Sequence, residues 1–350
     1  MVNMDLRTLD FTKFTGTDQE RKEFCQAFLD GITEVGFVKL INHGLDDKTN
    51  SELFQQVVSP INLFHFVPSM TDDTQSRNLF TLPREGKEEF ANVIGPKPQR
   101  GWSCIGAETT ATLNTPGVIN MVRVNNEGLK DLKEHFDMGP VDDPEFPNVY
   151  PSEEKAPGFK NWMEQYFIKS QHLSLQLMEA LEIALDLPKS ALVDRCEGHA
   201  SEIRMIYYPE TNVKELADGK SKRIWPHTDF GILTLLAQGS TGGLQIEDKN
   251  NPGGYVSVPL VDKTELLINV GDTLERWSNG RIPAGLHQVA ASGETEDGTL
   301  PERYSVAFFL KANRKTSAGP IPLFVPKGTI SKYEEMTALE YHRRRTAIMY

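Results

Sequence analysis

Apolar residues in the first part of the chain recur every three or four positions, which is the period of a helix with one buried face. Helices are predicted at residues 23–32, 53–61, 158–187 and 337–350. The pattern at residues 158–187 is the longest, and the step from Leu187 to Pro188 ends it because proline disfavours a helical residue before it. A helix of this length needs a sheet or other helices to cover its apolar stripe, so we expect it to back a sheet.

From about residue 202 the pattern changes to short runs rich in β-branched, aromatic and aliphatic residues, separated by Gly, Pro, Asn and Asp. Strands are predicted at residues 203–208, 231–238, 244–247, 255–258, 266–270, 287–290 and 304–310. Residues 248–254, which read DKNNPGG, are predicted to form a hairpin loop. Many short strands at this spacing favour a sandwich or barrel of the jelly-roll kind, so the expected fold class is mixed α/β (α+β).

Net charge and cysteine content exclude some classes of protein. The 350 residues include 49 acidic and 37 basic side chains, for a net charge of −12. This argues against a nucleic-acid partner, which needs a clustered positive surface. No run of 18 apolar residues occurs, so no membrane partner is expected. Three scattered cysteines and a first segment without a secretory pattern favour a reducing, cytoplasmic location, while the oligomeric state stays open.

Two histidines and one aspartate form the most informative polar pattern. His227 and Asp229 stand in WPHTDFG, residues 225–231, and His287 follows much later. Residues two apart on an extended chain point to the same side, so His227 and Asp229 can bind one metal from one strand end. Two imidazoles and one carboxylate are the facial triad that holds Fe(II) and leaves its other positions open. Taken alone, the three residues would more often be a surface histidine, a loop aspartate and an unrelated core histidine.

Arg303 and Ser305 share one face of the predicted strand that follows His287. A guanidinium and a hydroxyl in this arrangement can clamp a carboxylate, because the arginine fork donates two parallel charge-assisted hydrogen bonds. Either residue alone would be an ordinary strand residue. An iron enzyme with a keto-acid co-substrate needs a metal triad followed by such a clamp.

Further motifs occur along nearly the whole chain. They read GFVKLINHG at 36–44, KEHFDMG at 133–139, PN at 147–148, RMIYYP at 204–209, GGLQI at 242–246, NVGD at 269–272 and SNG at 278–280. In this order they resemble the Fe(II)/2-oxoglutarate-dependent dioxygenases, in the branch of isopenicillin N synthase and the plant flavonoid and gibberellin oxygenases. The resemblance specifies the jelly roll as a distorted double-stranded β-helix with helices on one outer face. We expect a mainly helical region at residues 1–200, a catalytic β-helix core at 201–315 and a C-terminal helical segment at 316–350, within one structural unit.

The resemblance implies an Fe(II) ion held by the triad, with 2-oxoglutarate and O2 as co-substrates. The far carboxylate of 2-oxoglutarate would be held by Arg303 and Ser305, with a further hydrogen bond from Tyr208. 2-Oxoglutarate would be converted to succinate and CO2 while a small organic molecule is hydroxylated, desaturated or rearranged, in specialised metabolism. Halogenating relatives lack the carboxylate ligand, so Asp229 predicts no halogenase activity. The chain departs from many relatives at Ile206, where they carry an asparagine that approaches the co-substrate.

Two other functions stay open. An Fe(II) oxidase that does not use 2-oxoglutarate, as in isopenicillin N synthase, would use Arg303 and Ser305 for a substrate carboxylate. A non-catalytic jelly-roll protein would bind a ligand without turnover.

Four residues are candidates for substrate contacts: Arg100, Trp102, Phe230 and Trp277. Arg100 and Trp102 could bind an anionic or aromatic substrate, or be a surface arginine and a packed tryptophan. Phe230 and Trp277 flank the triad in sequence and could form the pocket wall or the core. The identity of the substrate and the position at which it is oxidised do not follow from the sequence.

Overall fold

The computed structural model of the chain describes residues 6–45, 78–111, 113, 128–198, 200–216, 219–239, 241–259, 264–291 and 297–349. The helix predicted at residues 53–61 lies outside the described residues.

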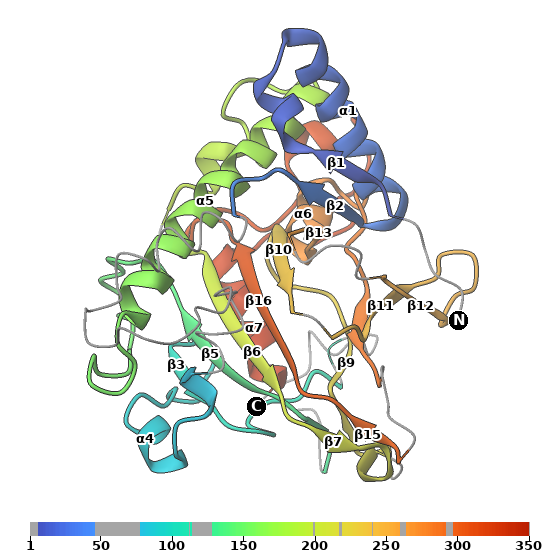
Figure 1. Cartoon of the computed structure of the whole chain (residues 1–350). Helices are drawn as coiled ribbons and strands as arrows, with labels where there is room; N and C mark the ends of the chain where they lie inside the picture. The colour runs from blue at the N-terminus through green and yellow to red at the C-terminus, as the bar shows by residue number, and fades with distance from the viewer. Residues whose placement is uncertain are drawn as a thin grey trace.

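The centre of the molecule is an eight-stranded sheet with the order β1-β2-β13-β10-β16-β6-β5-β3 (Figure 1). Neighbouring strands are antiparallel except β1 and β2, which are parallel. The strands are β1 (Thr8–Asp10), β2 (Phe37–Ile41), β3 (Gly101–Ser103), β5 (Glu134–Met138), β6 (Glu202–Tyr208), β10 (Leu233–Gln238), β13 (Leu266–Val270) and β16 (Arg303–Leu310).

A smaller antiparallel sheet with the order β12-β11-β14-β9 faces one side of this large sheet. Its strands are β9 (Ile224–His227), β11 (Leu244–Glu247), β12 (Tyr255–Ser257) and β14 (His287–Val289). Apolar side chains from both sheets form one cluster, in which Ile206 of β6 packs with Ile224 and Ile246 of the small sheet. Two short ribbons complete the strands: β4 (Lys130–Asp131) with β8 (Ser221–Lys222), and β7 (Thr211–Asn212) with β15 (Thr299–Leu300). This two-sheet arrangement confirms the predicted jelly roll.

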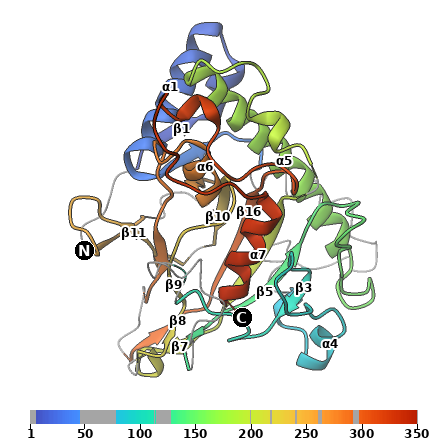
Figure 2. The ribbon, with the colours of Figure 1, turned by 180° about the vertical axis from the view of Figure 1, so that it is seen from behind.

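The helices are α1 (Asp18–Val35), α4 (Arg84–Glu88), α5 (Phe159–Ala184), α6 (Asp272–Trp277) and α7 (Ala338–Met349). Of these, α1 and α5 pack against strands of the large sheet. The long helix α5 backs the sheet, as predicted: the ring of Phe167 lies edge-on to that of Phe308 in β16, with 5.2 Å between centroids. Figure 2 shows the C-terminal helix α7 in front of β16. The helix α1 starts at a capping box formed by Thr17 and Glu20.

Most predicted elements are present with shifted ends. The strands predicted at 244–247 and 266–270 agree with β11 and β13 in both bounds, and residues 248–254 form the predicted hairpin loop, closed by a hydrogen bond from Asp248 N to Gly254 O. The strand β9 and the helix α6 were not predicted. Four strands from before residue 200, β1, β2, β3 and β5, extend the large sheet, so the first region is less purely helical than expected. The division at residues 200 and 315 stays a prediction.

No helix among the described residues is long and apolar enough to cross a membrane.

The turn from α1 into β2 depends on Gly36, which has a left-handed backbone with φ of 82°. A Cβ atom there would lie 2.9 Å from the Cα of Gly285, two residues before His287. We expect Gly36→Ala to lower the free energy of unfolding by more than the roughly 1 kcal/mol that a left-handed backbone costs an alanine. Urea denaturation measures this. The matched control is Gly44→Ala, where φ is 80° but nothing lies within 4 Å of the added methyl group. Equal losses in both variants would contradict a close contact at Gly36.

Candidate active site

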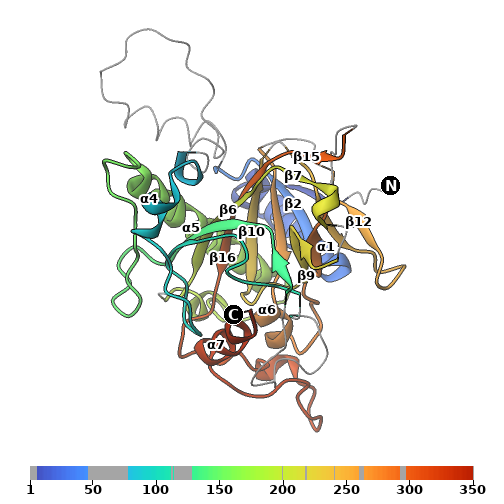
Figure 3. The same cartoon turned by 90° about the horizontal axis from the view of Figure 1, so that it is seen from below.

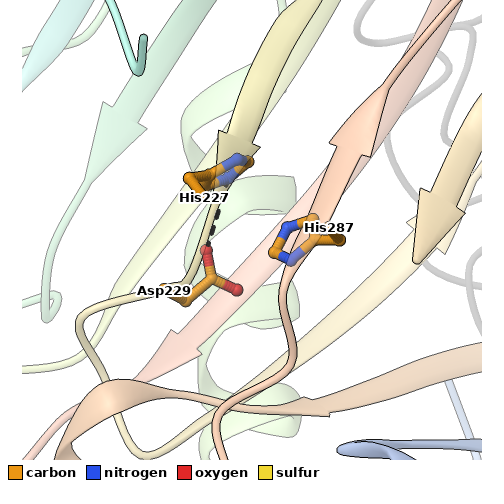
Figure 4. A group of neighbouring side chains, drawn as sticks. All are labelled: His227, Asp229 and His287. Carbon is orange, nitrogen blue, oxygen red and sulfur yellow. Dashed lines mark ion pairs between the residues drawn. The ribbon is translucent and has the colours of Figure 1, made fainter. Parts of the chain in front are cut away.

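His227, Asp229 and His287 come together at the edge of the small sheet (Figure 4). His227 ends β9 and His287 begins the adjacent strand β14, where the two residues are direct partners in the pairing. The imidazole ring centroids are 4.3 Å apart, and one possible ligand atom from each of the three side chains lies within 4.8 Å of the others. The donor set and its spacing fit one small metal ion.

The backbone fixes how the two imidazoles point. Nδ1 of His227 lies 2.8 Å from the carbonyl oxygen of Trp225, and Nδ1 of His287 lies 2.9 Å from that of Gly285. A carbonyl only accepts a hydrogen bond, so each Nδ1 must carry the proton, and Nε2 is left as the lone-pair donor to a metal. The protein therefore orients both rings before any metal binds.

Hydrogen bonds from two side chains orient the carboxylate of Asp229. Its Oδ2 accepts hydrogen bonds from Thr234 Oγ1 at 2.6 Å and from Asn269 Nδ2 at 2.8 Å. Oδ1 instead faces Nε2 of His227 at 3.8 Å. The carboxylate thus has one oxygen bound to the protein and one directed at the metal position.

The titration of these groups favours a neutral histidine beside an ionised aspartate. Burial, together with the nearby His287, holds the pKa of His227 below its usual value. Burial raises the pKa of Asp229, but the two imidazoles and the hydrogen bonds from Asn269 and Thr234 outweigh it, so the pKa ends below the usual value. Metal ligation needs these two protonation states.

Arg303 and Ser305 share the face of β16 that looks toward the small sheet, as the strand period predicts. Arg303 donates from Nη1 to Ser305 Oγ at 3.0 Å and from Nη2 to Gln238 Oε1 at 3.2 Å. Its guanidinium also lies over the ring of Tyr208, its partner in the adjacent strand, at 4.9 Å from the centroid. The three predicted carboxylate-binding residues are therefore brought together.

A pocket opens at the triad between the sheets and the C-terminal helix, and Figure 3 views this end of the molecule from below. His342, Thr346 and Met349 of α7 form part of its wall. The rest of the described lining includes Ile206, Ile224, Phe230, Glu108, Lys133, Arg204 and Lys311. Apolar and ionised side chains therefore meet next to the metal position.

Comparisons with known proteins show the family of this chain. A family model described as the 2OG-Fe(II) oxygenase superfamily matches residues 200–312. The chain is 48% identical to the 2-oxoglutarate-dependent dioxygenase ecdK of Aspergillus rugulosus, over 99% of this chain and 100% of that protein. It is 36% identical to the proline hydroxylase buaE of Petromyces alliaceus, over 98% of each. The crystal structure of a full-length Neurospora crassa protein in complex with alpha-KG matches with a TM-score of 0.79 and 27% identity, over 99% of this chain and 98% of that one.

The chain belongs to the 2OG-Fe(II) oxygenase superfamily. It is a 2-oxoglutarate-dependent dioxygenase, and its cofactors are Fe(II) and 2-oxoglutarate. The triad fits such a metal by its donor atoms and their orientation.

The four residues predicted to contact the substrate occupy different places in this oxygenase. Phe230 lies in the pocket wall. Arg100, Trp102 and Trp277 lie outside the lining as the structure describes it, and each makes structural contacts. Arg100 forms ion pairs with Asp143 and Glu202. The indoles of Trp102 and Trp277 pack in the core and donate to Glu134 and to the carbonyl of Ser317.

Several residues of the oxygenase site were not singled out from the sequence. Thr234 and Asn269 hold Asp229, Gln238 holds Arg303, and Lys133 and Arg204 are among the charged residues of the pocket wall. Asn269 lies in the NVGD motif, so its polar side chain within an apolar strand was the signal available for it. Ile206, noted as a departure from many relatives, lies in the pocket wall as an apolar residue.

Proposed function

We propose that this oxygenase uses 2-oxoglutarate and O2 to oxidise a small organic molecule at an Fe(II) ion held by His227, Asp229 and His287. In this proposal Arg303, Ser305 and Tyr208 hold the far carboxylate of 2-oxoglutarate. The observation that carries it is the pre-oriented triad, together with a buried arginine clamp on the face of β16 that looks toward the small sheet. Hydroxylation, desaturation and rearrangement are the reaction types that the family resemblance implies, as part of specialised metabolism.

An iron ion at this site would supply O2 activation coupled to decarboxylation of 2-oxoglutarate to succinate and CO2. Nε2 of His227, Nε2 of His287 and Oδ1 of Asp229 are the atoms that would hold it. Three protein ligands would leave positions for small ligands. In this proposal Arg303 fixes the direction of the co-substrate, and α7 contributes His342, Thr346 and Met349 to the pocket wall.

The pocket wall favours a substrate that carries polar or ionised groups on a small apolar body. Lys133 and Arg204 both pair with Glu108, so charges of both signs face the cavity close to Ile206 and Phe230. These side chains can hydrogen-bond to a polar group of the substrate, which a wholly apolar molecule lacks. The relative named proline hydroxylase supports a substrate of this class.

We also propose that the segments 1–200, 201–315 and 316–350 fold as one unit in the cytoplasm. Strands from the first two segments share one sheet, and α7 from the third forms part of the pocket wall. All three cysteines are free thiols, which supports a reducing compartment.

The decisive experiment is an anaerobic titration of the metal-free protein with Fe(II) and then with 2-oxoglutarate. We expect the visible charge-transfer band of an iron-bound 2-oxo acid, and release of one succinate for each substrate oxidised in air. Iron binding without the band or succinate would support the oxidase that does not use 2-oxoglutarate, which the names of the relatives do not favour. Absence of turnover with amino acids and other polar small molecules would support the non-catalytic binding protein.

A further inference from the structure

Arg223 is a deeply buried cation without an acidic partner among the described residues. It directly precedes β9, and its side chain is 2% exposed. Its Nη2 donates to the backbone carbonyl of Pro301, while Nε and Nη1 are buried and have no hydrogen-bond partner in the described part of the chain. Neither its contacts nor the causes of its pKa shift include a carboxylate. Nε and Nη1 of this charged side chain are therefore shielded from water without a hydrogen-bond acceptor among the described residues.

Other buried arginines of the described chain have their guanidinium groups compensated by the protein. Arg100 pairs with Asp143 and Glu202, and Arg345 pairs with Asp272. Arg276 donates from both Nε and Nη2 to backbone carbonyls. Burying a guanidinium without such compensation costs several kcal/mol in general, because the charge loses its hydration. The contrast at Arg223 points to a compensating group that the chain itself does not provide.

The position of Arg223 identifies that group. Pro301 lies two residues before Arg303, so the bond to its carbonyl holds Arg223 at the end of β16 where the carboxylate clamp lies. Burial and the charge of Arg303 both lower the pKa of Arg223, whereas Tyr208 raises it. Arg223 thus shares the electrostatic surroundings of Arg303 and Tyr208, and two like charges buried together are stabilised by an anion between or beside them.

We propose that Arg223 is a second anion-binding residue of the 2-oxoglutarate site, and that its Nε and Nη1 serve the far carboxylate together with Arg303. This inference rests on the proposed function, because Arg303 defines where that carboxylate lies. A carboxylate accepts about four hydrogen bonds, so it can use both guanidinium groups at once. The consequence is specificity: a 2-oxo acid without the second carboxylate leaves two buried cations uncompensated and binds poorly.

The test compares two ligands on the full chain loaded anaerobically with Fe(II), by titration calorimetry. The ligands are 2-oxoglutarate and 2-oxovalerate, which has the same carbon chain with a methyl group in place of the far carboxylate. For Arg223→Met we expect at least tenfold weaker binding of 2-oxoglutarate and a change of less than about twofold for 2-oxovalerate. Arg223→Lys keeps the charge but not the fork, so an intermediate loss is expected.

The matched control is Arg195→Met, because Arg195 also donates to a backbone carbonyl, that of Ala191, but its guanidinium lies over the ring of Trp277 and not at the start of β16. It should bind both ligands as the unaltered chain does. Two outcomes would overturn the inference: unchanged 2-oxoglutarate binding in Arg223→Met and Arg223→Lys, or equal losses for both ligands. Arg223 would then have only a structural role, through its hydrogen bond to the Pro301 carbonyl.

A third variant, Arg303→Gln, distinguishes failure of this inference from failure of the proposed function. If it selectively loses 2-oxoglutarate while Arg223→Met does not, only the inference about Arg223 fails. If the unaltered chain does not bind 2-oxoglutarate, the proposed function itself fails.

Discussion

Asp229→Ala is expected to abolish Fe(II) binding, and all turnover with it, at metal concentrations that saturate the unaltered chain. The substitution removes the anionic ligand of the triad and the negative charge that it places beside His227 and His287 at the metal position. Two neutral imidazoles alone hold Fe(II) weakly, since carboxylate oxygen contributes both a bond and charge neutralisation. Iron content after gel filtration and succinate release are the two measurements.

A milder variant distinguishes loss of the Asp229 ligand from loss of a hydrogen bond that orients it. Thr234→Val keeps all three ligands but removes one of the two hydrogen bonds to Oδ2, so iron affinity should fall by roughly 10- to 100-fold and turnover should return at high metal. In Asp229→Ala the buried donors of Thr234 and Asn269 lose their acceptor, at about 1–3 kcal/mol each, so urea denaturation must show that the fold survives. Full iron binding and activity in a folded Asp229→Ala protein would refute the assignment of the triad.

The strand period accounts for what the sequence could predict of this site. Alternation along β16 separates Arg303 and Ser305, which face the small sheet, from Tyr304 and Val306, which pack in the main core. The same rule relates His227 to Asp229. Local pattern therefore shows which side chains share a face, although it does not show which faces meet.

Which strand faces come into contact depends on the pairing of strands that are far apart in the sequence. His287 reaches His227 because β14 and β9 are neighbours in the small sheet, and only the family resemblance implied that contact in advance. Arg204 meets Glu108 across two segments far apart in sequence, and Arg223 meets the Pro301 carbonyl in the same way. Neither pair has a spacing that marks it. The strands β1 and β3 are three residues long, too short for alternation to be read from the sequence.

Arg303→Ala should raise the KM for 2-oxoglutarate by roughly 30- to 150-fold, while kcat at saturating co-substrate changes far less. A charged carboxylate would lose its charge-assisted partner, which is worth on the order of 2–3 kcal/mol. The substitution affects KM more than kcat because the far carboxylate does not take part in the bonds that react. Initial rates of succinate release, measured over a range of 2-oxoglutarate at fixed substrate, give both constants.

Ser305→Ala gives a comparison for the rise in the KM for 2-oxoglutarate expected in Arg303→Ala. It removes a neutral hydroxyl that accepts from Arg303 at 3.0 Å, which is worth about 1 kcal/mol, so KM should rise only about fivefold. The order of the two variants follows from charge: the guanidinium supplies both the ion pair and the fork, whereas the hydroxyl supplies one hydrogen bond. An unchanged requirement for 2-oxoglutarate in Arg303→Ala would show that other residues bind its far carboxylate. A rise in the KM for the organic substrate alone would instead assign Arg303 to a substrate carboxylate, as an oxidase that does not use 2-oxoglutarate requires.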